Sequence, residues 1–110
     1  MNKPNYLAHL AAGTALLSLF CLPARAQGAD ETLFKAKCAV CHGADGKGET
    51  AVGKMNKLKD LGSADVQKQS DSDLTEIIAN GKGKMPGYSK SLKPEQMKDL
   101  VAYIRSLAKK

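Results

Sequence analysis

The sequence predicts an all-α fold, and three observations lead to that prediction. Apolar residues recur at helical spacing near the C-terminus, in the clearest amphipathic pattern of the chain. Glycine-rich loops separate the segments that show this periodicity. No segment alternates apolar and polar residues as a half-buried strand would. We therefore expect about four short helices joined by loops.

The first 26 residues have the pattern of a secretory signal peptide that is cleaved from the working protein. Lys3 gives a positive start, Leu7–Leu22 is apolar, and Ala24-Arg25-Ala26 resembles a cleavage site. A retained membrane anchor is the alternative, but the apolar stretch is short for a span of ~20 residues. We expect cleavage, one domain over residues 27–110, and no stable membrane insertion.

The composition of this domain limits what it can do. It contains no Trp and few other aromatic residues, so a chain of this size builds only a marginal core without a staple or bound group. Lys and Arg total 17 against 11 Asp and Glu, a net charge of +6 for the whole sequence. The lysines form no block interleaved with aromatics, which argues against nucleic-acid binding. A basic surface instead suits transient docking on an acidic protein or an anionic membrane.

The first predicted helix begins at Asp30, which can serve as its N-cap, and stops near His42. The residues at helical spacing within it are Leu33, Phe34, Lys37, Cys38 and Cys41. A loop with three glycines follows over Gly43–Gly48. It lacks the spacing of a phosphate-binding loop, and no strand precedes it. Residues 55–62 show no clear pattern.

Three further helical segments are predicted. Ser63 can cap a short turn that runs to Lys68. Ser70–Asp73 is a capping pattern that opens a longer helix, which Gly81 ends. The last helix begins at Pro94 and continues to Lys109-Lys110, whose charges suit the negative end of the helix dipole. The apolar faces of the two longer helices consist of Leu74, Ile77 and Ile78 in one, and of Met97, Leu100, Val101, Ile104, Leu107 and Ala108 in the other.

Cys38-Ala39-Val40-Cys41-His42 carries the strongest chemical signal. Two cysteines at this spacing, with a histidine directly after the second, form the attachment site of a c-type haem. Each thiol adds across one haem vinyl group, and His42 is then placed to ligate the iron. A redox disulfide would need a neighbouring βαβ pattern, and a zinc site would need a second Cys or His pair, and neither is present. We predict one covalent haem c with its iron, held by Cys38 and Cys41.

The second axial ligand must come from the same domain. His9 and Cys21 are removed with the signal peptide, so His42 is the only histidine left. Of the remaining methionines, Met97 belongs to a helix face and Met55 lies among lysines, so both are expected to be packing residues. Met85 lies in a glycine-rich loop that can approach the haem, and it is the predicted ligand. Ligation by His and Met raises the reduction potential.

From about residue 30 to residue 110, the chain resembles a small class I cytochrome c of bacterial periplasms and photosynthetic lumens. The resemblance rests on the Cys38–His42 motif, on Met85-Pro86, and on the terminal helix. It implies a class I cytochrome c fold, in which the first and last helices cross and the haem lies between the helices and loops. By this resemblance Tyr88 is the aromatic residue that often follows the Met-Pro step. The resemblance also implies mutual packing of Phe34, Leu100 and Tyr103.

Two positions depart from the pattern of that family. Asp30 stands where family members usually have a small residue at the helix crossing, so either the crossing is looser or the helix starts there. The family commonly uses a proline carbonyl to accept a hydrogen bond from Nδ1 of the axial histidine. No proline lies between His42 and Met85, so a carbonyl of the loop over residues 48–55, or a water, must accept this bond.

The sequence therefore predicts a soluble one-electron carrier and not an enzyme, because two protein ligands leave no place on the iron for a substrate. Its partners are a redox donor and a redox acceptor. An acidic surface of each partner would meet lysines around an exposed haem edge near Cys41 and the Met85 loop. The lysines expected there are Lys47, Lys82, Lys84 and Lys90. We expect a monomer in the periplasm or in another exported compartment such as a thylakoid lumen.

Two alternatives use the same residues differently. A haem enzyme or gas-binding module would have Met85 off the iron, but peroxidase-type chemistry needs a distal acid–base group, and no second histidine is available. A dedicated subunit of a respiratory or dehydrogenase complex would use the same haem chemistry, and a stable co-purifying partner would distinguish it from a free carrier.

Overall fold

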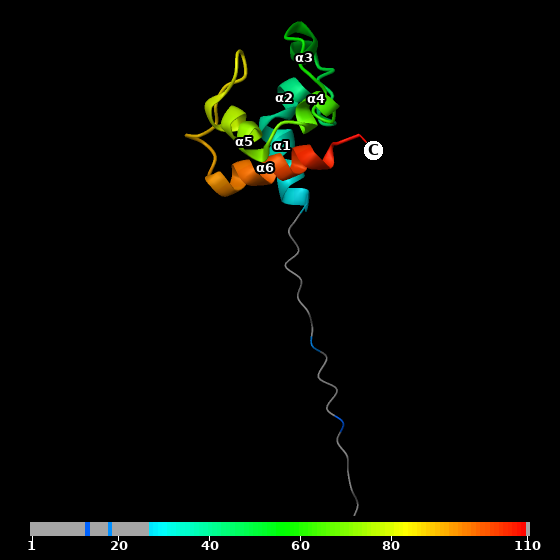
Figure 1. Cartoon of the computed structure of the whole chain (residues 1–110), viewed down its shortest axis with the longest axis vertical. Coiled ribbons are helices and arrows are strands. Elements are labelled where there is room, and N and C mark those ends of the chain that lie inside the picture. Colours follow the sequence, from blue (N-terminus) through cyan, green and yellow to red (C-terminus); the bar gives the residue numbers. More distant parts are fainter. Residues whose placement is uncertain (1–12, 14–17, 19–26, 110) are drawn as a thin grey trace, which may run out of the picture.

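The structure is a computed structural model that describes residues 13, 18 and 27–109 (Figure 1). The predicted signal peptide, with His9 and Cys21, lies outside the described residues except for positions 13 and 18. The helices are α1 (Gln27–Lys37), α2 (Ala39–His42), α3 (Ala51–Met55), α4 (Ala64–Gln67), α5 (Asp71–Asn80) and α6 (Pro94–Ser106). Over the described ranges, the only pairing of the β type is an isolated bridge between Lys82 and Met85. The predicted all-α class is confirmed.

The described chain contains more helical segments than the four expected. The first predicted helix is divided at Cys38 into α1 and α2, and α3 was not predicted. α1 begins at Gln27, so Asp30 lies in its first turn and the prediction that Asp30 caps the helix is wrong. The Asp30 carboxylate still lies near the positive end of the helix dipole. None of the described helices is both long enough and apolar enough to cross a bilayer.

α3 is fastened directly to α2. Thr50 Oγ1 accepts a hydrogen bond from the Gly53 amide at 2.9 Å and donates one to the Cys41 carbonyl at 2.6 Å. A Cβ atom on Gly53 would clash with the carbonyl oxygens of Gly48 and Cys41. Glycine at this position therefore lets α3 approach the turn that carries Cys41.

α4 and α5 begin where the sequence predicts. Ser63 precedes α4, but its Oγ is buried and forms no hydrogen bond to a described residue, so the predicted side-chain cap is wrong. The Val66 amide donates to the Ser63 carbonyl at 3.2 Å instead. α5 has a complete capping box, in which Ser70 Oγ accepts from the Asp73 amide and Asp73 Oδ2 accepts from the Ser70 amide. Gly81 ends the helix with a φ of 79°.

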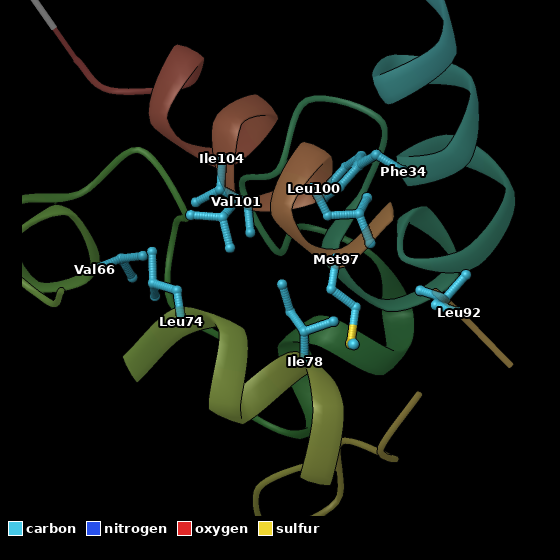
Figure 2. Packing of buried hydrophobic residues seen from close by; sticks show 9 residues of the cluster. All are labelled: Phe34, Val66, Leu74, Ile78, Leu92, Met97, Leu100, Val101 and Ile104. Atoms are coloured by element: carbon cyan, nitrogen blue, oxygen red, sulfur yellow. The ribbon is translucent and has the colours of Figure 1, made fainter. Parts of the chain in front are cut away.

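The hydrophobic core lies between α6, α5 and α1 (Figure 2). α6 supplies more of its buried side chains than any other helix, in agreement with its amphipathic pattern. Met97 is one of them, so its predicted packing role is confirmed. The nine buried residues are Phe34, Val66, Leu74, Ile78, Leu92, Met97, Leu100, Val101 and Ile104.

α1 and α6, the first and last described helices, cross (Figure 1), and Phe34 of α1 lies beside Leu100 of α6 (Figure 2). Phe34 and Leu100 are each only 1% exposed. The ring of Phe34 lies 4.9 Å from the ring of Tyr103, with 44° between the ring planes. This tilted arrangement is favourable for an aromatic pair beyond the area that it buries. The predicted crossing and the implied packing of these three side chains are therefore confirmed.

Arg105 fastens α6 to the segment between α4 and α5. Its guanidinium donates to the carbonyl oxygens of Gln67 and Gln69 and pairs with the Asp71 carboxylate at 2.8 Å. The Arg105 side chain is 29% exposed, so these bonds are partly shielded from water. They fix the C-terminal half of α6 relative to the start of α5.

α6 ends at Ser106, before the predicted end at Lys109-Lys110. Beyond it the chain folds back, because the Lys109 amide donates to the Gly62 carbonyl and its ammonium pairs with Asp60 at 2.9 Å. The hydrogen-bonded Lys109 ammonium, together with the Gly62 amide, holds the pKa of Asp60 below its usual value. Lys109 therefore stabilises a loop rather than a helix end, and Lys110 lies outside the described residues.

Candidate functional site

A cavity of about 570 Å³ lies beside α2, between α3 and the loop that follows α5. In Figure 1 both flanking segments project beyond α2 at the end of the domain away from α6. Its volume is within the range of roughly 300–1,000 Å³ that is typical of cofactor pockets. The structure brings all four predicted site residues to this cavity: Cys38, Cys41, His42 and Met85.

The break between α1 and α2 positions the two thiols. The Cys38 amide still bonds to the Phe34 carbonyl at 2.8 Å, and the His42 amide bonds to the Cys38 carbonyl at 3.0 Å. Cys41 therefore lies about one helical turn after Cys38, and both are half-buried free thiols. Burial, with a smaller effect of Cys41, raises the pKa of Cys38 to about 11. The Cys38 thiol is thus protonated at neutral pH, which makes it a weak metal ligand and a slow nucleophile.

His42 is held by its backbone and has one unsatisfied ring nitrogen. Its carbonyl accepts a hydrogen bond from the Gly48 amide at 2.7 Å. Burial lowers the pKa of the imidazole, which favours the neutral form that ligates metals. Nδ1 is buried and has no hydrogen-bond partner among the described residues. Of the two predicted acceptors for Nδ1, a carbonyl of residues 48–55 or a water, the carbonyl is therefore wrong. The Thr50 hydroxyl of this segment bonds to the Cys41 carbonyl instead.

The loop after α5 presents Met85 to the cavity. Backbone bonds of 3.1 and 3.0 Å join Lys82 and Met85 in a tight turn. Gly81, with its positive φ, packs so closely that a Cβ atom there would clash with the Met85 carbonyl. The Tyr88 amide donates to the Ile78 carbonyl at 2.9 Å and so anchors the far end of the loop on α5. Met85 is half-buried in this rigid setting.

Tyr88 and Ile77 close the wall of the cavity that faces α1 and α5. The Tyr88 hydroxyl donates to the Lys37 carbonyl at 3.1 Å, directly before the first cysteine. Ile77 belongs to the predicted apolar face of α5, but it lines the cavity, whereas Ile78 enters the core. These side chains give the cavity the apolar wall that a large flat cofactor needs.

The segment after α3 forms a wall that the sequence did not reveal. Met55 lines the cavity with 78% of its surface exposed, so its predicted packing role is wrong. α3 is too short to turn Met55 toward the core, and it is fastened to Cys41. Thr50 is a residue type favoured at the N-cap, and it is the sequence feature that could have predicted this helix. The residues that continue the wall are Asn56, Lys57 and Leu58.

The charged side chains that line the cavity are all lysines: Lys37, Lys57, Lys82 and Lys84. The predicted positions of Lys82 and Lys84 at the site are therefore confirmed. Lys47 and Lys90 are exposed but do not line the cavity. No acidic residue lines it, so the rim is positive.

The chemistry of these groups fits a haem. In the described part of the chain, no three His, Cys, Asp or Glu residues are arranged to hold a metal ion by themselves. The cavity instead offers two thiols one turn apart, a neutral imidazole, a thioether and apolar walls. These are the groups that attach a haem to a chain and ligate its iron.

Comparisons with known proteins agree with this chemistry. The family profile described as "Cytochrome C oxidase, cbb3-type, subunit III" matches residues 26–104. Cytochrome c6 from Gloeothece citriformis is 35% identical over 86 residues, which cover 76% of this chain and 73% of that protein. The cbb3-type cytochrome c oxidase subunit FixP from Azorhizobium caulinodans is 34% identical, and the match covers 77% of this chain but only 28% of FixP.

A solved structure of the KustC0563 c-type cytochrome superimposes with a TM-score of 0.68 and 32% sequence identity. The match covers 73% of this chain and 98% of that one. The relatives confirm the predicted haem c cofactor and the predicted role as an electron carrier rather than an enzyme. An electron carrier implies redox partners. The chain therefore belongs to the class I cytochrome c family.

Proposed function

We propose that this chain carries single electrons through one haem c bound by Cys38, Cys41, His42 and Met85. The convergence of these four residues on one cavity of about 570 Å³ carries the proposal. When bound, the haem supplies a one-electron iron couple. The two cysteines would hold it covalently, and His42 and Met85 would both ligate the iron, which would leave no place on it for a substrate.

The side chains around the cavity control how much water reaches the haem, and they also affect its reduction potential. Ile77, Leu58 and Tyr88 exclude water from the walls of the cavity, which favours the less charged ferrous state. The Met85 thioether favours the same state. The backbone bonds of the loop keep Met85 in place, so little rearrangement accompanies a change of oxidation state.

The purified protein is expected to keep its haem under denaturing conditions and to give a low-spin spectrum that carbon monoxide does not change. Intact mass spectrometry should show one haem added to a chain that begins at Gln27, because we propose that the signal peptide is cleaved after Ala26. Replacement of both Cys38 and Cys41 with serine should remove the covalent haem. A matched Val40→Ala variant, between the two cysteines, should retain it.

Two results would contradict the proposal. A high-spin spectrum that shifts with carbon monoxide would indicate an open iron position and an enzyme or gas-binding module. Covalent haem in the variant without Cys38 and Cys41 would show that the attachment residues are wrong.

We also propose that the lysines around the cavity bind an acidic surface on the redox donor and acceptor. This lysine rim consists of Lys37, Lys57, Lys82 and Lys84. Lys82 and Lys84 line the cavity on the Met85 loop, and no acidic residue opposes them there. Such contacts steer association more than they tighten it. The complex is expected to be short-lived and small, and the carrier itself a monomer.

Neutralising Lys82 and Lys84 with glutamine is expected to slow electron transfer to an acidic redox protein by about tenfold at low salt, because steering charge is lost. The double variant should also show a weaker dependence of this rate on ionic strength. The measurement is stopped-flow oxidation of the reduced protein over a range of salt concentrations. A double variant of Lys47 and Lys90 to glutamine removes the same charge away from the cavity and should behave like the unsubstituted protein. If the rate depended equally on ionic strength in the two double variants, the proposed docking role of Lys82 and Lys84 would be refuted.

The site of action we propose is the periplasm or another exported compartment, because haem c is attached after translocation.

The oxidase-subunit profile and the FixP relative favour a second candidate, a module that works within a larger oxidase complex. Isolation of the chain from its own cell at native abundance separates these two cases. A stable stoichiometric partner would favour the module, and a monomeric peak would favour the free carrier.

A further inference from the structure

Lys57 has a backbone conformation that normally favours glycine. Its φ is 52°, and it is the only non-glycine residue with a positive φ within the described ranges. It lies just after α3, where the Lys57 amide bonds to the Lys54 carbonyl at 3.2 Å and the Leu58 amide bonds to the Gly53 carbonyl at 2.9 Å. These two bonds define a Schellman motif with Lys57 in its left-handed position. A side chain there costs free energy that glycine would avoid.

The Lys57 side chain lies at a cavity that contains no carboxylate. Most of the described ion pairs join a lysine to a nearby acid, and the neighbouring Lys59 pairs with Asp65 at 3.3 Å. No ion pair of the described residues includes Lys57. A strained residue that persists at a ligand site suggests that its side chain has a role there.

The haem itself brings the missing negative charge. It carries two propionate carboxylates on the edge opposite the two vinyl groups that Cys38 and Cys41 would bind. Lys37 precedes Cys38 directly, so it belongs to the thioether edge. Lys57 stands on the wall after α3, which projects away from the α1–α6 crossing (Figure 1). Lys57 is therefore a cation on the cavity wall at the end of α3 opposite Thr50, the residue that bonds to Cys41.

We propose that Lys57 is a positioning residue whose ammonium pairs with a haem propionate, and that this pairing is why the position holds lysine despite its positive φ. The proposal rests on the haem c function proposed above. The ammonium orients the propionate edge against the α3 wall. It also partly neutralises the propionate charge near the iron, so it favours the ferrous state.

The test compares the midpoint potentials of substituted holoproteins. Lys57→Gly and Lys57→Asn both remove the charge, and both residues tolerate a positive φ. At a fixed solution potential, each should shift the ratio of ferric to ferrous protein toward ferric by roughly threefold to tenfold. Lys57→Arg keeps the charge and should shift the ratio much less. Lys59→Asn is the matched control. It removes the same charge two positions further along the chain, and Lys59 already pairs with Asp65.

A purely structural lysine would behave differently. Lys57→Gly would then raise the melting temperature, by roughly 2–6 °C for a domain of this size, and leave the potential unchanged. If Lys57→Gly and Lys57→Asn carried normal covalent haem but had the same midpoint potential as Lys59→Asn, the proposed pairing alone would be overturned. An unsubstituted protein without covalent haem would instead overturn the proposed function, and the pairing with it.

Discussion

Replacement of Leu100 with alanine is expected to lower the free energy of unfolding by about 3–4 kcal/mol. Leu100 is 1% exposed and lies where α6 crosses α1, against Phe34. The cavity left behind cannot easily collapse, because Arg105 fixes α6 to the segment before α5. A loss of this size is a large part of the roughly 5–15 kcal/mol that stabilises a small domain. Guanidinium unfolding of the holoprotein, followed by circular dichroism, measures the change.

Val40→Ala provides the control for that measurement. Val40 lies on α2 with 72% of its surface exposed, so its truncation should change the free energy of unfolding by about 0.5 kcal/mol or less. If Leu100→Ala cost no more than Val40→Ala, the crossing of α1 and α6 would not be the centre of the core.

Replacement of Met85 with alanine is expected to have the largest effect on the redox chemistry. The midpoint potential should fall by on the order of 0.1–0.3 V, because the thioether that favours ferrous iron is removed. The spectrum should become high-spin and respond to carbon monoxide. Redox titration and optical spectra of the purified variant test both expectations.

Met97 and Met55 are not expected to replace Met85. Met97 is buried in the core, and Met55 lies on the cavity wall formed by α3, the helix that Thr50 fastens to Cys41. Met55→Ala makes the same deletion at the same cavity and is expected to leave the spectrum low-spin, which makes it the matched control. A low-spin Met85→Ala protein together with a high-spin Met55→Ala protein would reverse the assignment of the ligand.

The parts of this fold that could be predicted from sequence depend on local chemistry. The capping box of α5 and the periodicity of α6 are determined by residues a few positions apart. The four residues at the cavity were found in the same way, from the spacing of Cys38, Cys41 and His42 and from the glycine-rich setting of Met85. Such signals do not require knowledge of the tertiary contacts.

The parts that could not be predicted depend on contacts between distant segments. α3 is held by the hydrogen bond from Thr50 to the Cys41 carbonyl and by the close approach of Gly53 to the Gly48 and Cys41 carbonyl oxygens, and its short apolar pattern gave no sign of either. The exposed position of Met55 follows from that attachment. Ile77 and Ile78 are adjacent on one helix face, and only the tertiary arrangement decides which lines the cavity and which enters the core.

The crossing of α1 and α6 has a consequence for the order of folding. Phe34 needs Leu100 and Tyr103, which come from the opposite end of the domain, so nearly the whole chain must be closed into a loop before the core can form. An exported chain emerges from the translocation channel with its N-terminal end first. Under the export and haem attachment proposed above, the Cys38–His42 turn would therefore be exposed before α6, and the last helix would close the core around a chain that already carries its cofactor.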